Sequence, residues 1–346
     1  MKQRLCYIIC LLLLHTSSFA LTVSPSNDAF AYQGRIDHSK PSPVIVWQGS
    51  EIQTQFSGQT LKLGFSDLEG QVFFNVDVDG ESLIIKASNG WQTIPRKFTS
   101  GVHSLRLFKR SEASAGWVTF EGIQVDDNAK LTKPQQSSKT NTFIFYGDSI
   151  TVGACNEDGD NDQWEDRSTH NTALSYATLV ANAFNANYRN IAISGMGISK
   201  GYQNYTAKEV WNRFYPDPTS QIAPLHSYQP NILFVNFGEN DDSFTKNKAQ
   251  DFPVDFEKNY IQLVETFRKH YPNSQIVLLR GGMYGGAKSL RLIEPWKKVV
   301  AALEAKDKNI HHYVFEHWYA QHPRVKNHRI MADELTAWLK KQSWFQ

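Results

Sequence analysis

The chain has 346 residues, of which 41% are hydrophobic and 20% are charged, an ordinary globular balance with room for about two domains. The formal net charge is only +2, so electrostatics give the chain no reason to bind nucleic acid or an anionic membrane. The aromatic content of 13%, with nine Trp, is high and suits either β-sandwich packing or stacking against sugars.

Residues 1–20 have the features of a secretory signal peptide. Two basic residues precede an apolar run over 5–14, and Ser18 and Ala20 supply the small residues of a cleavage site. The run is too short for a membrane span. Cleavage after Ala20 would leave a neutral chain with Cys155 as its one cysteine, which excludes an internal disulfide. We therefore expect a secreted or periplasmic protein.

Residues 21–131 have the pattern of an all-β domain. Short segments that alternate or run apolar are separated by turn residues, including Asp79-Gly80 and Asn89-Gly90. The predicted strands are 43–47, 52–56, 60–65, 71–78, 82–85, 102–108 and 116–125. Strands this short and this evenly spaced favour a β-sandwich or jelly roll.

A polar stretch over 132–141 predicts a linker, and the pattern changes in the remaining segment, 142–346. There apolar runs alternate with amphipathic helices, which favours a parallel sheet with helices on both faces. The predicted strands are 142–146, 188–193, 232–237, 275–279 and 312–315, and the predicted helices are 173–184, 254–270, 289–305 and 325–341. In such a fold the functional loops follow the carboxyl ends of the strands.

Four of these loops carry groups that suit acyl transfer. A Gly-Asp-Ser triplet ends the first strand in a tight turn that exposes Ser149 at a helix start. Gly195 follows the second strand, Asn240 the third and His322 the fifth. A serine hydroxyl needs a base, and the ordinary pKa of histidine suits that task. The N–H groups of Ser149 and Gly195 and the Asn240 amide can hold the oxyanion of an attacked carbonyl.

Each of these residues also has an ordinary structural reading. A Gly-Asp-Ser triplet after a strand can be a turn and helix cap, and Gly195 and Asn240 can serve turns or caps. His322 is one of several histidines near the end of the chain. Cys155 reads as a small buried residue, although its place soon after the serine leaves a reactive role open. The order of the loops, serine first and histidine last, favours the catalytic reading.

These motifs resemble the marker blocks of the SGNH (GDSL-type) hydrolase superfamily. The blocks are Gly147-Asp148-Ser149, Ser194-Gly195, Gly238-Glu239-Asn240-Asp241 and His322-Pro323. With its leading β domain, the chain is most similar to carbohydrate esterase family two, in which a jelly roll precedes an SGNH domain that deacetylates sugars. The resemblance implies a three-layer, flavodoxin-like C-terminal domain with Ser149 as nucleophile and His322 as base.

One position departs from the superfamily pattern. Three residues before His322, where an acid usually orients the imidazole, this chain has Tyr319. The family that it resembles includes enzymes with a Ser–His dyad, in which a backbone carbonyl orients the ring, and we prefer that reading. Glu316 is the nearest upstream acid and a possible substitute. Weak or lost catalysis is the third alternative.

The acidic loop after the serine begins, over 158–169, like a calcium loop. Gln163 stands where that loop requires glycine and Thr169 where it requires glutamate, which favours a solvated or substrate-lining loop. The sequence contains no metal-binding His or Cys spacing and no phosphate-binding glycine motif, so we expect no metal and no cofactor.

Three aromatic residues, Trp164, Tyr284 and Trp318, lie on or near loops that can flank the site. Each is either a packing residue or a platform for a sugar ring, and packing is the commoner role. The β domain can likewise bind glycan or only buttress the site, and we favour the second.

The leading hypothesis is an exported carbohydrate esterase that removes O-acetyl groups from a polysaccharide or oligosaccharide through an acyl-enzyme on Ser149. The first alternative is a lipase-like or thioesterase-like SGNH hydrolase that acts on longer acyl chains. The second is a non-catalytic carbohydrate-binding protein with a relic esterase site. A preference for longer acyl chains in ester hydrolysis would distinguish the first alternative from the leading hypothesis. Sugar binding without hydrolysis would distinguish the second.

Overall fold

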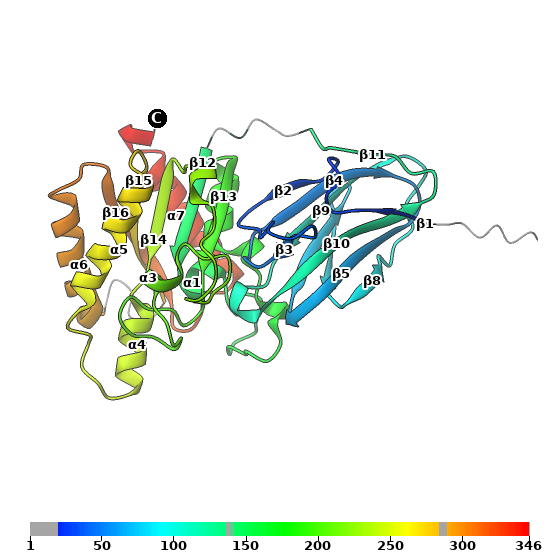
Figure 1. Ribbon diagram of the computed structural model, residues 1–346. Coiled ribbons are helices and arrows are strands. Elements are labelled where there is room, and N and C mark those ends of the chain that lie inside the picture. The colour runs from blue at the N-terminus through cyan, green and yellow to red at the C-terminus, as the bar shows by residue number, and fades with distance from the viewer. Residues whose placement is uncertain (1–19, 136–138, 140, 284–288, 346) are drawn as a thin grey trace, which may run out of the picture.

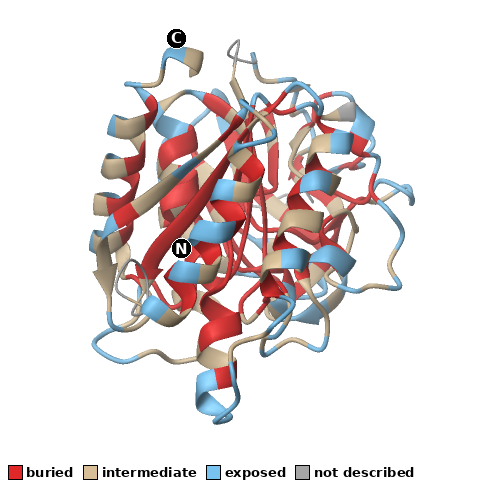
Figure 2. Cartoon of the chain, turned by 90° about the vertical axis from the view of Figure 1, so that its left-hand side faces the viewer, coloured by how far each residue is buried: buried red, intermediate tan, exposed pale blue. Residues whose placement is uncertain are grey.

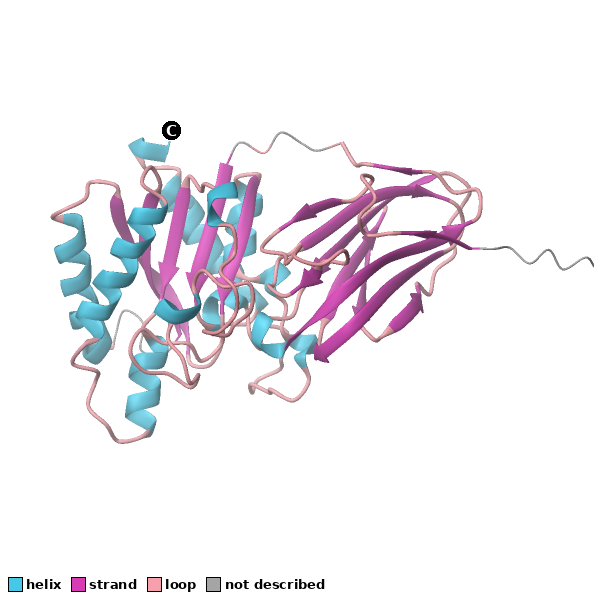
Figure 3. Ribbon diagram, viewed as in Figure 1, coloured by secondary structure: helices cyan, strands magenta, loops and turns pink. Residues whose placement is uncertain are grey.

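The computed structural model describes residues 20–135, 139, 141–283 and 289–345. Apart from Ala20, the predicted signal peptide lies outside these ranges. The chain forms an N-terminal β domain and a C-terminal domain of mixed helices and strands, which lie side by side (Figure 1). Figure 3 shows that nearly all of the helix belongs to the second domain.

The N-terminal domain consists of two antiparallel sheets that pack face to face. Its strands are β1 (Ala20–Val23), β2 (Ala31–Gln33), β3 (Val44–Ile45), β4 (Glu51–Ser57), β5 (Leu61–Gly70), β6 (Phe73–Val78), β7 (Glu81–Lys86), β8 (Gly90–Thr93), β9 (Val102–Lys109), β10 (Gly116–Asp126) and β11 (Leu131–Thr132). One sheet has the order β1-β10-β5-β8, with β3 on β10, and the other β11-β4-β9-β6-β7, with β2 on β4. Phe56, Leu63 and Phe74 are buried between the sheets. This confirms the predicted all-β sandwich.

The sequence did not predict four of these strands, β1, β2, β8 and β11. Each has four residues or fewer. In β1 and β8 most side chains are exposed, so neither strand carries the alternation of apolar and polar residues that marks a half-buried strand. Short strands at sheet margins are set by their neighbours rather than by their own sequence.

The C-terminal domain is built on a five-stranded parallel sheet. Its strands are β12 (Asn141–Gly147), β13 (Ala186–Ala192), β14 (Ile232–Asn236), β15 (Gln275–Met283) and β16 (Ile310–Tyr319). They lie in the order β13-β12-β14-β15-β16. Numbered within the domain, this is the order 2-1-3-4-5 of flavodoxin-like sheets, as the resemblance implied.

Helices cover both faces of this sheet and bury it (Figure 2). They are α1 (Ser149–Val152), α2 (Tyr176–Ala183), α3 (Ala207–Val210), α4 (Glu239–Asn247), α5 (Phe256–His270), α6 (Leu290–Glu304) and α7 (Val325–Leu339). Phe143 and Phe145 of β12 pack with residues of α2 and α7, whereas Ile144 and Tyr146 pack with α5 and α6. Because both faces of β12 are buried, its sequence is a continuous apolar run.

The four predicted helices are present as α2, α5, α6 and α7, with ends that differ by a few residues. Pro295 lies inside α6, which begins at Leu290. The sequence did not predict α4, because its residues are mostly polar and its helical pattern is weak. Within the ranges that the structure describes, no helix is both long and apolar enough to span a membrane.

The two domains share buried contacts rather than only a linker. Trp47, which is 1% exposed, belongs to the same apolar cluster as residues of the C-terminal domain, and its indole N–H donates to the Phe214 carbonyl at 2.7 Å. The Gln48 amide donates to the Ala192 carbonyl, at the end of β13, at 2.8 Å. The β-sandwich therefore holds the carboxyl edge of the parallel sheet, where functional loops lie.

Candidate active site

The local fold at the end of β12 presents Ser149. The Asp148 carboxylate accepts a hydrogen bond from the Ile150 N–H at 3.1 Å and so caps α1. Gly147 is required at the turn, because a Cβ there would lie 2.2 Å from the Thr151 hydroxyl oxygen. The serine is only 5% exposed, but it lines a pocket.

Three side chains from distant parts of the chain form a hydrogen-bonded series. The Ser149 Oγ lies 2.9 Å from the His322 Nε2, and the His322 Nδ1 lies 2.6 Å from an Asp162 carboxylate oxygen. Arg324 donates to the other Asp162 oxygen at 2.7 Å. His322 follows β16 and Asp162 lies in the acidic loop after α1. The three side chains are of the types that acyl transfer uses as nucleophile, base and orienting group, and they are in contact.

The electrostatics of Asp162 suit an orienting carboxylate. Burial works against its ionisation, but the hydrogen bond and charge of His322, together with Arg324, outweigh burial and lower the pKa of Asp162 to about 2. The carboxylate is therefore ionised at neutral pH and can accept the Nδ1–H of the imidazole. That bond leaves Nε2 as the acceptor that faces the serine.

The structure puts Asp162 at the imidazole, where the sequence suggested a backbone carbonyl or Glu316. Glu316 is exposed on β16, and its backbone N–H donates to the Glu334 carboxylate at 3.0 Å. Asp162 was missed because it precedes His322 by 160 residues, and only the folded loop brings the two together. The clustering of acidic residues in that loop was the one signal in the sequence.

The three expected oxyanion donors all belong to residues that line the pocket with Ser149 and His322. The Asn240 side-chain amide, in the first turn of α4, donates to the Met196 carbonyl at 3.0 Å, and an amide group has a second N–H to offer. Within the described residues, the backbone N–H groups of Ser149 and Gly195 donate to no protein acceptor. These donors are available to a substrate oxygen.

The loop that carries Gly195, residues 194–201 and here called the Gly195 loop, is fixed by two carboxylates. Glu112 accepts from the Ser194 N–H at 2.9 Å, and Asp241 accepts from the three N–H groups of residues 198–200 at 2.7 to 2.9 Å. Burial raises the pKa of Asp241 to about 6 although these N–H groups favour its ionised form. Glu112 comes from the N-terminal domain and was not singled out by any sequence pattern.

The pocket has a volume of about 570 Å³, and its wall combines polar and apolar surface. Besides the residues already named, it is lined by Ser114, Trp164, Arg167, Tyr202, Gln203, Glu239, Ser243 and Met283. Of the three aromatic candidates, Trp164 is in this wall, with its ring 5.2 Å from the His322 ring and nearly perpendicular to it. Trp318 is not in the wall, and Tyr284 lies outside the described residues.

Two buried acids, Asp148 and Glu239, lie next to Ser149 or in the same pocket wall. Glu239 pairs with the fully buried Arg280 at 2.8 Å, and burial raises the pKa of Glu239 against the attraction of that guanidinium. Burial, reinforced by Glu239, outweighs the Ile150 N–H and raises the pKa of Asp148 to about 7. Burial therefore disfavours the ionised form of both acids.

In the acidic loop after α1, Asp158 and Cys155 have structural surroundings. Both Asp158 oxygens accept hydrogen bonds from Gln163, one from its N–H at 2.8 Å and one from its side-chain amide at 3.1 Å. Cys155 is fully buried, and burial, with the nearby Asp162 and Asp158 carboxylates, raises the pKa of its thiol. A buried thiol of raised pKa is a poor nucleophile.

A serine, histidine and aspartate in contact at the carboxyl edge of a flavodoxin-like sheet, with N–H donors beside the serine, define a hydrolase of the SGNH type. Comparison with protein families agrees. Residues 145–335 match the GDSL-like Lipase/Acylhydrolase family, and residues 32–134 match the model described as Carbohydrate esterase 2 N-terminal. The chain therefore belongs to the GDSL-like lipase/acylhydrolase family and has the two-domain form of family 2 carbohydrate esterases, which are carboxylic ester hydrolases.

Individual relatives are similar over almost the whole chain. The chain is 30% identical to cellulase/esterase CelE of Acetivibrio thermocellus over 93% of its own length, but it spans only 41% of that protein. It is 26% identical to an acetylxylan esterase / glucomannan deacetylase of Cellvibrio japonicus, over 96% of this chain and 92% of that one. A family two carbohydrate esterase from Clostridium thermocellum, solved with cellohexaose, superposes with a TM-score of 0.76 at 28% identity, over 91% and 99% of the two chains.

Proposed function

We propose that this protein removes O-acetyl groups from a polysaccharide or oligosaccharide through a covalent acetyl-enzyme on Ser149. The observation that carries the proposal is the contact of Ser149, His322 and Asp162 at the wall of a pocket that also holds the three candidate oxyanion donors. The similarity to an acetylxylan esterase / glucomannan deacetylase over nearly the full length of both chains supports this choice of substrate.

The first half of the reaction begins at the 2.9 Å contact between the two reacting side chains. The imidazole Nε2 of His322 takes the hydroxyl proton as the Ser149 oxygen attacks the acetyl carbonyl carbon. Asp162 accepts the Nδ1–H and stabilises the imidazolium that forms. The tetrahedral intermediate then expels the sugar oxygen, which receives the proton from Nε2 and leaves as a hydroxyl group.

The second half repeats these steps with water. His322 takes a proton from the water, whose oxygen attacks the acetyl-serine carbonyl, and then returns a proton to Ser149 Oγ as acetate leaves. In both halves the carbonyl oxygen becomes negative and needs fixed donors. The N–H groups of Ser149 and Gly195 and the Asn240 amide serve as those donors, and each is worth about 3 kcal/mol of transition-state stabilisation.

The pocket wall favours a sugar ester over a long acyl chain. Ser114, Arg167, Gln203 and Ser243 bring polar groups to the wall, and Trp164, Tyr202 and Met283 are its large aromatic or apolar side chains among the described residues. Sugar hydroxyls can pair with the polar groups, whereas a long alkyl chain would leave them unpaired.

The function is tested by acetate release from acetylated xylan, acetylated glucomannan and simple acetyl sugars. We compare wild type with Ser149→Ala, and with Ser243→Ala as the matched control, because Ser243 lines the pocket and makes none of the hydrogen bonds of His322. We expect release by wild type and Ser243→Ala and none by Ser149→Ala. Faster turnover of octanoyl than acetyl esters would instead favour a lipase-like enzyme, and sugar binding with no hydrolysis by wild type would favour a binding protein.

We also propose that the protein is exported after cleavage following Ala20. The support is the sequence of residues 1–20, in which a basic start, an apolar run and small residues before the cleavage site follow one another. Expression of the full chain, followed by N-terminal sequencing of the protein in the periplasm and the medium, should find Leu21 as the first residue. A full-length chain that remains in the cytoplasm would contradict export.

A further inference from the structure

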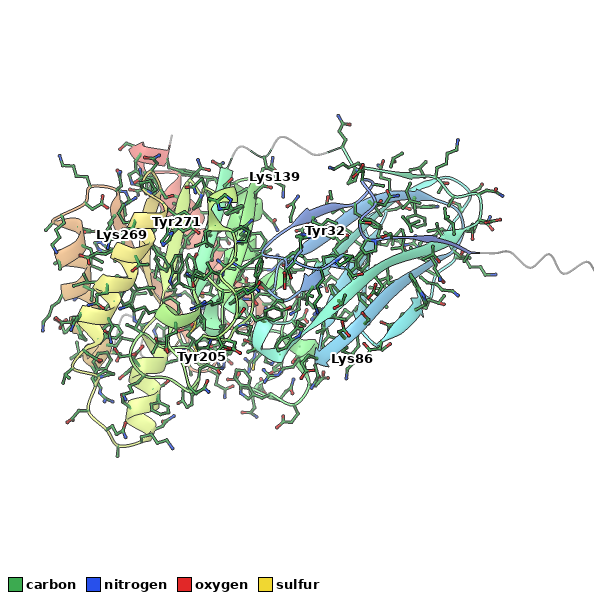
Figure 4. The ribbon with its side chains drawn as sticks, viewed as in Figure 1. Tyr32, Lys86, Lys139, Tyr205, Lys269 and Tyr271 are labelled. Carbon is green, nitrogen blue, oxygen red and sulfur yellow. The ribbon has the colours of Figure 1, made fainter. Side chains whose placement is uncertain are left out.

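A second groove, of about 660 Å³, lies between the two domains and has none of the residues of the active-site pocket in its wall. We call it the interdomain groove. Its aromatic wall consists of Trp117 at the start of β10 and Tyr205, Phe214 and Tyr215 from the loops on either side of α3. Two carboxylates, Asp37 and Asp217, also line it. In Figure 4, Tyr205 lies at the lower edge of the C-terminal domain, towards which β12 runs.

Contacts across the domain interface hold this groove in shape. Arg35 of the β-sandwich donates to the Trp211 carbonyl at 2.8 Å, and Tyr215 donates from its hydroxyl to Asp37 at 3.2 Å. The Trp117 and Tyr215 rings meet edge to face, with centroids 5.3 Å apart. Since these groups are already fixed, a ligand would pay little conformational entropy to order them.

The groove offers both an apolar face and unused hydrogen-bonding groups. Within the described part of the chain, neither the Trp117 indole N–H nor the Tyr205 hydroxyl has a hydrogen-bond partner, although both rings are half-buried. Asp217 uses one carboxylate oxygen for Thr219, which leaves the other for a ligand donor. Aromatic faces beside donors and acceptors match a sugar, which has C–H faces and a rim of hydroxyls.

The charge of the groove selects against other ligand classes. Its described wall holds two carboxylates and no Lys, Arg or His. A phosphate, a uronic acid or a nucleic acid would meet repulsion there with no cation to offset it. The groove therefore suits an uncharged glycan.

The groove and the active-site pocket are lined by neighbouring residues of the same two segments. Gln203 lines the pocket and Tyr205 lines the groove, and on the facing domain Ser114 lines the pocket and Trp117 the groove. Residues two or three apart along a chain are separated by at most about 10 Å. One oligosaccharide can therefore lie in both.

We propose that the interdomain groove is a distal subsite that binds the uncharged backbone of the polysaccharide while an acetylated sugar of the same chain occupies the pocket. The proposal rests on the proposed esterase function for its choice of ligand. It gives the N-terminal domain a binding role through Asp37 and Trp117, beyond the buttressing role that its sequence suggested.

The test compares acetylated xylo-oligosaccharides of increasing length with p-nitrophenyl acetate, which is too small to reach the groove. We use Trp117→Ala and the milder Tyr205→Phe, with Trp91→Ala as the matched control, because Trp91 is a tryptophan of the same domain that is 40% exposed on β8. We expect Trp117→Ala to lower kcat/KM about tenfold on long oligosaccharides, mainly through KM, and to leave p-nitrophenyl acetate turnover unchanged. We expect Trp91→Ala to behave like wild type on both substrates. Tyr205→Phe should show a smaller loss of the same kind.

The subsite would be overturned if kcat/KM depended on oligosaccharide length equally in wild type and both groove variants. It would also be overturned if the variants lost equal activity on oligosaccharides and on p-nitrophenyl acetate. A direct measurement keeps this outcome separate from failure of the esterase function. Calorimetric titration of unacetylated xylo-oligosaccharide into Ser149→Ala, with and without Trp117→Ala, needs no turnover. Weaker binding to the double variant than to Ser149→Ala supports the subsite even in an inactive protein. Equal binding to both proteins, or no binding to Ser149→Ala, contradicts it.

Discussion

Glu112 of the β-sandwich accepts a hydrogen bond from the backbone N–H of Ser194, at 2.9 Å, in the loop that holds the proposed oxyanion donor Gly195. The carboxylate is fully buried and its other oxygen lies 3.3 Å from the Arg167 guanidinium. An acid from one domain thus fixes the backbone next to a donor of the other. The proposed catalytic geometry is consequently a property of both domains.

Glu112→Ala should lower kcat much more than it raises KM. It leaves the Ser194 N–H buried and unpaired, which costs about 1–3 kcal/mol of stability, and it frees the Gly195 loop to move. We expect kcat to fall about ten- to a hundredfold, less than for outright removal of a donor. Steady-state kinetics with p-nitrophenyl acetate, beside thermal unfolding, measures both effects.

Glu112→Gln is the conservative partner of this variant, because its amide oxygen can still accept the Ser194 N–H. It should recover most of the lost kcat. Glu121→Gln, a change in the same domain at a side chain that pairs with Ser42 and Ser66, is the control and should leave kcat unchanged. Equal kcat in wild type and Glu112→Ala would show that the loop needs no such support.

Asp162→Asn tests which acid orients the imidazole. The amide can present an N–H to Nδ1 and favour the wrong tautomer, so kcat should fall by about two to four orders of magnitude with little change in KM. Glu316→Gln makes the same kind of change, from carboxylate to amide, and should leave kcat and KM unchanged. If Glu316→Gln is the damaging change, or if neither is, His322 is oriented by something other than Asp162.

Asn240→Ala removes the side-chain donor of the proposed oxyanion site. A donor of this kind contributes mainly in the transition state, so kcat should fall about 10²- to 10³-fold. Asn141→Ala serves as control, because Asn141 donates to the Phe184 carbonyl at the opposite end of the sheet. A change confined to KM would mean that Asn240 binds substrate and does not stabilise the oxyanion.

The buried Asp148 should make stability depend on pH. Its pKa is about 7 in the folded protein and 3.8 ordinarily, so the folded state holds a proton that the unfolded state loses as pH rises between these values. The contribution of Asp148 to the free energy of unfolding is full below pH 4 and decreases as pH rises to about 7. In Asp148→Asn, which can still cap α1, this decrease should vanish.

Thermal unfolding at several pH values from 4 to 8 measures the effect as the difference between wild type and Asp148→Asn. Titrating groups that do not interact with Asp148 are common to both proteins and cancel in that difference. The free energy of unfolding of wild type should fall relative to that of Asp148→Asn as pH rises from 4 to 7. Parallel curves would mean that Asp148 titrates alike in the folded and unfolded states.

Much of the fold could be predicted because it follows local rules. The apolar run of β12 and the stripe on α7 are each visible within a few residues, and the turn before Ser149 requires glycine at Gly147. Ser149 and His322 could be chosen because each falls on a loop at the same edge of the sheet.

The supporting groups could not be predicted because their roles depend on contacts between distant segments. Asp162 reaches His322 only because the loop after α1 folds back. Glu112 reaches Ser194 only because the β-sandwich docks against the edge of the parallel sheet. Neither residue stands at a spacing that distinguishes it from other acids of the chain, so only the folded chain identifies them.

The central claim is that Ser149 carries the acetyl group between the two halves of the reaction. Rapid quenching after mixing with p-nitrophenyl acetate, followed by mass spectrometry of peptides, tests this directly. Wild type should show one added acetyl group on the peptide that contains Ser149, together with a burst of nitrophenol, and Ser149→Ala should show neither. Sustained ester hydrolysis by Ser149→Ala, or an acetyl group that accumulates on another residue, would contradict the account.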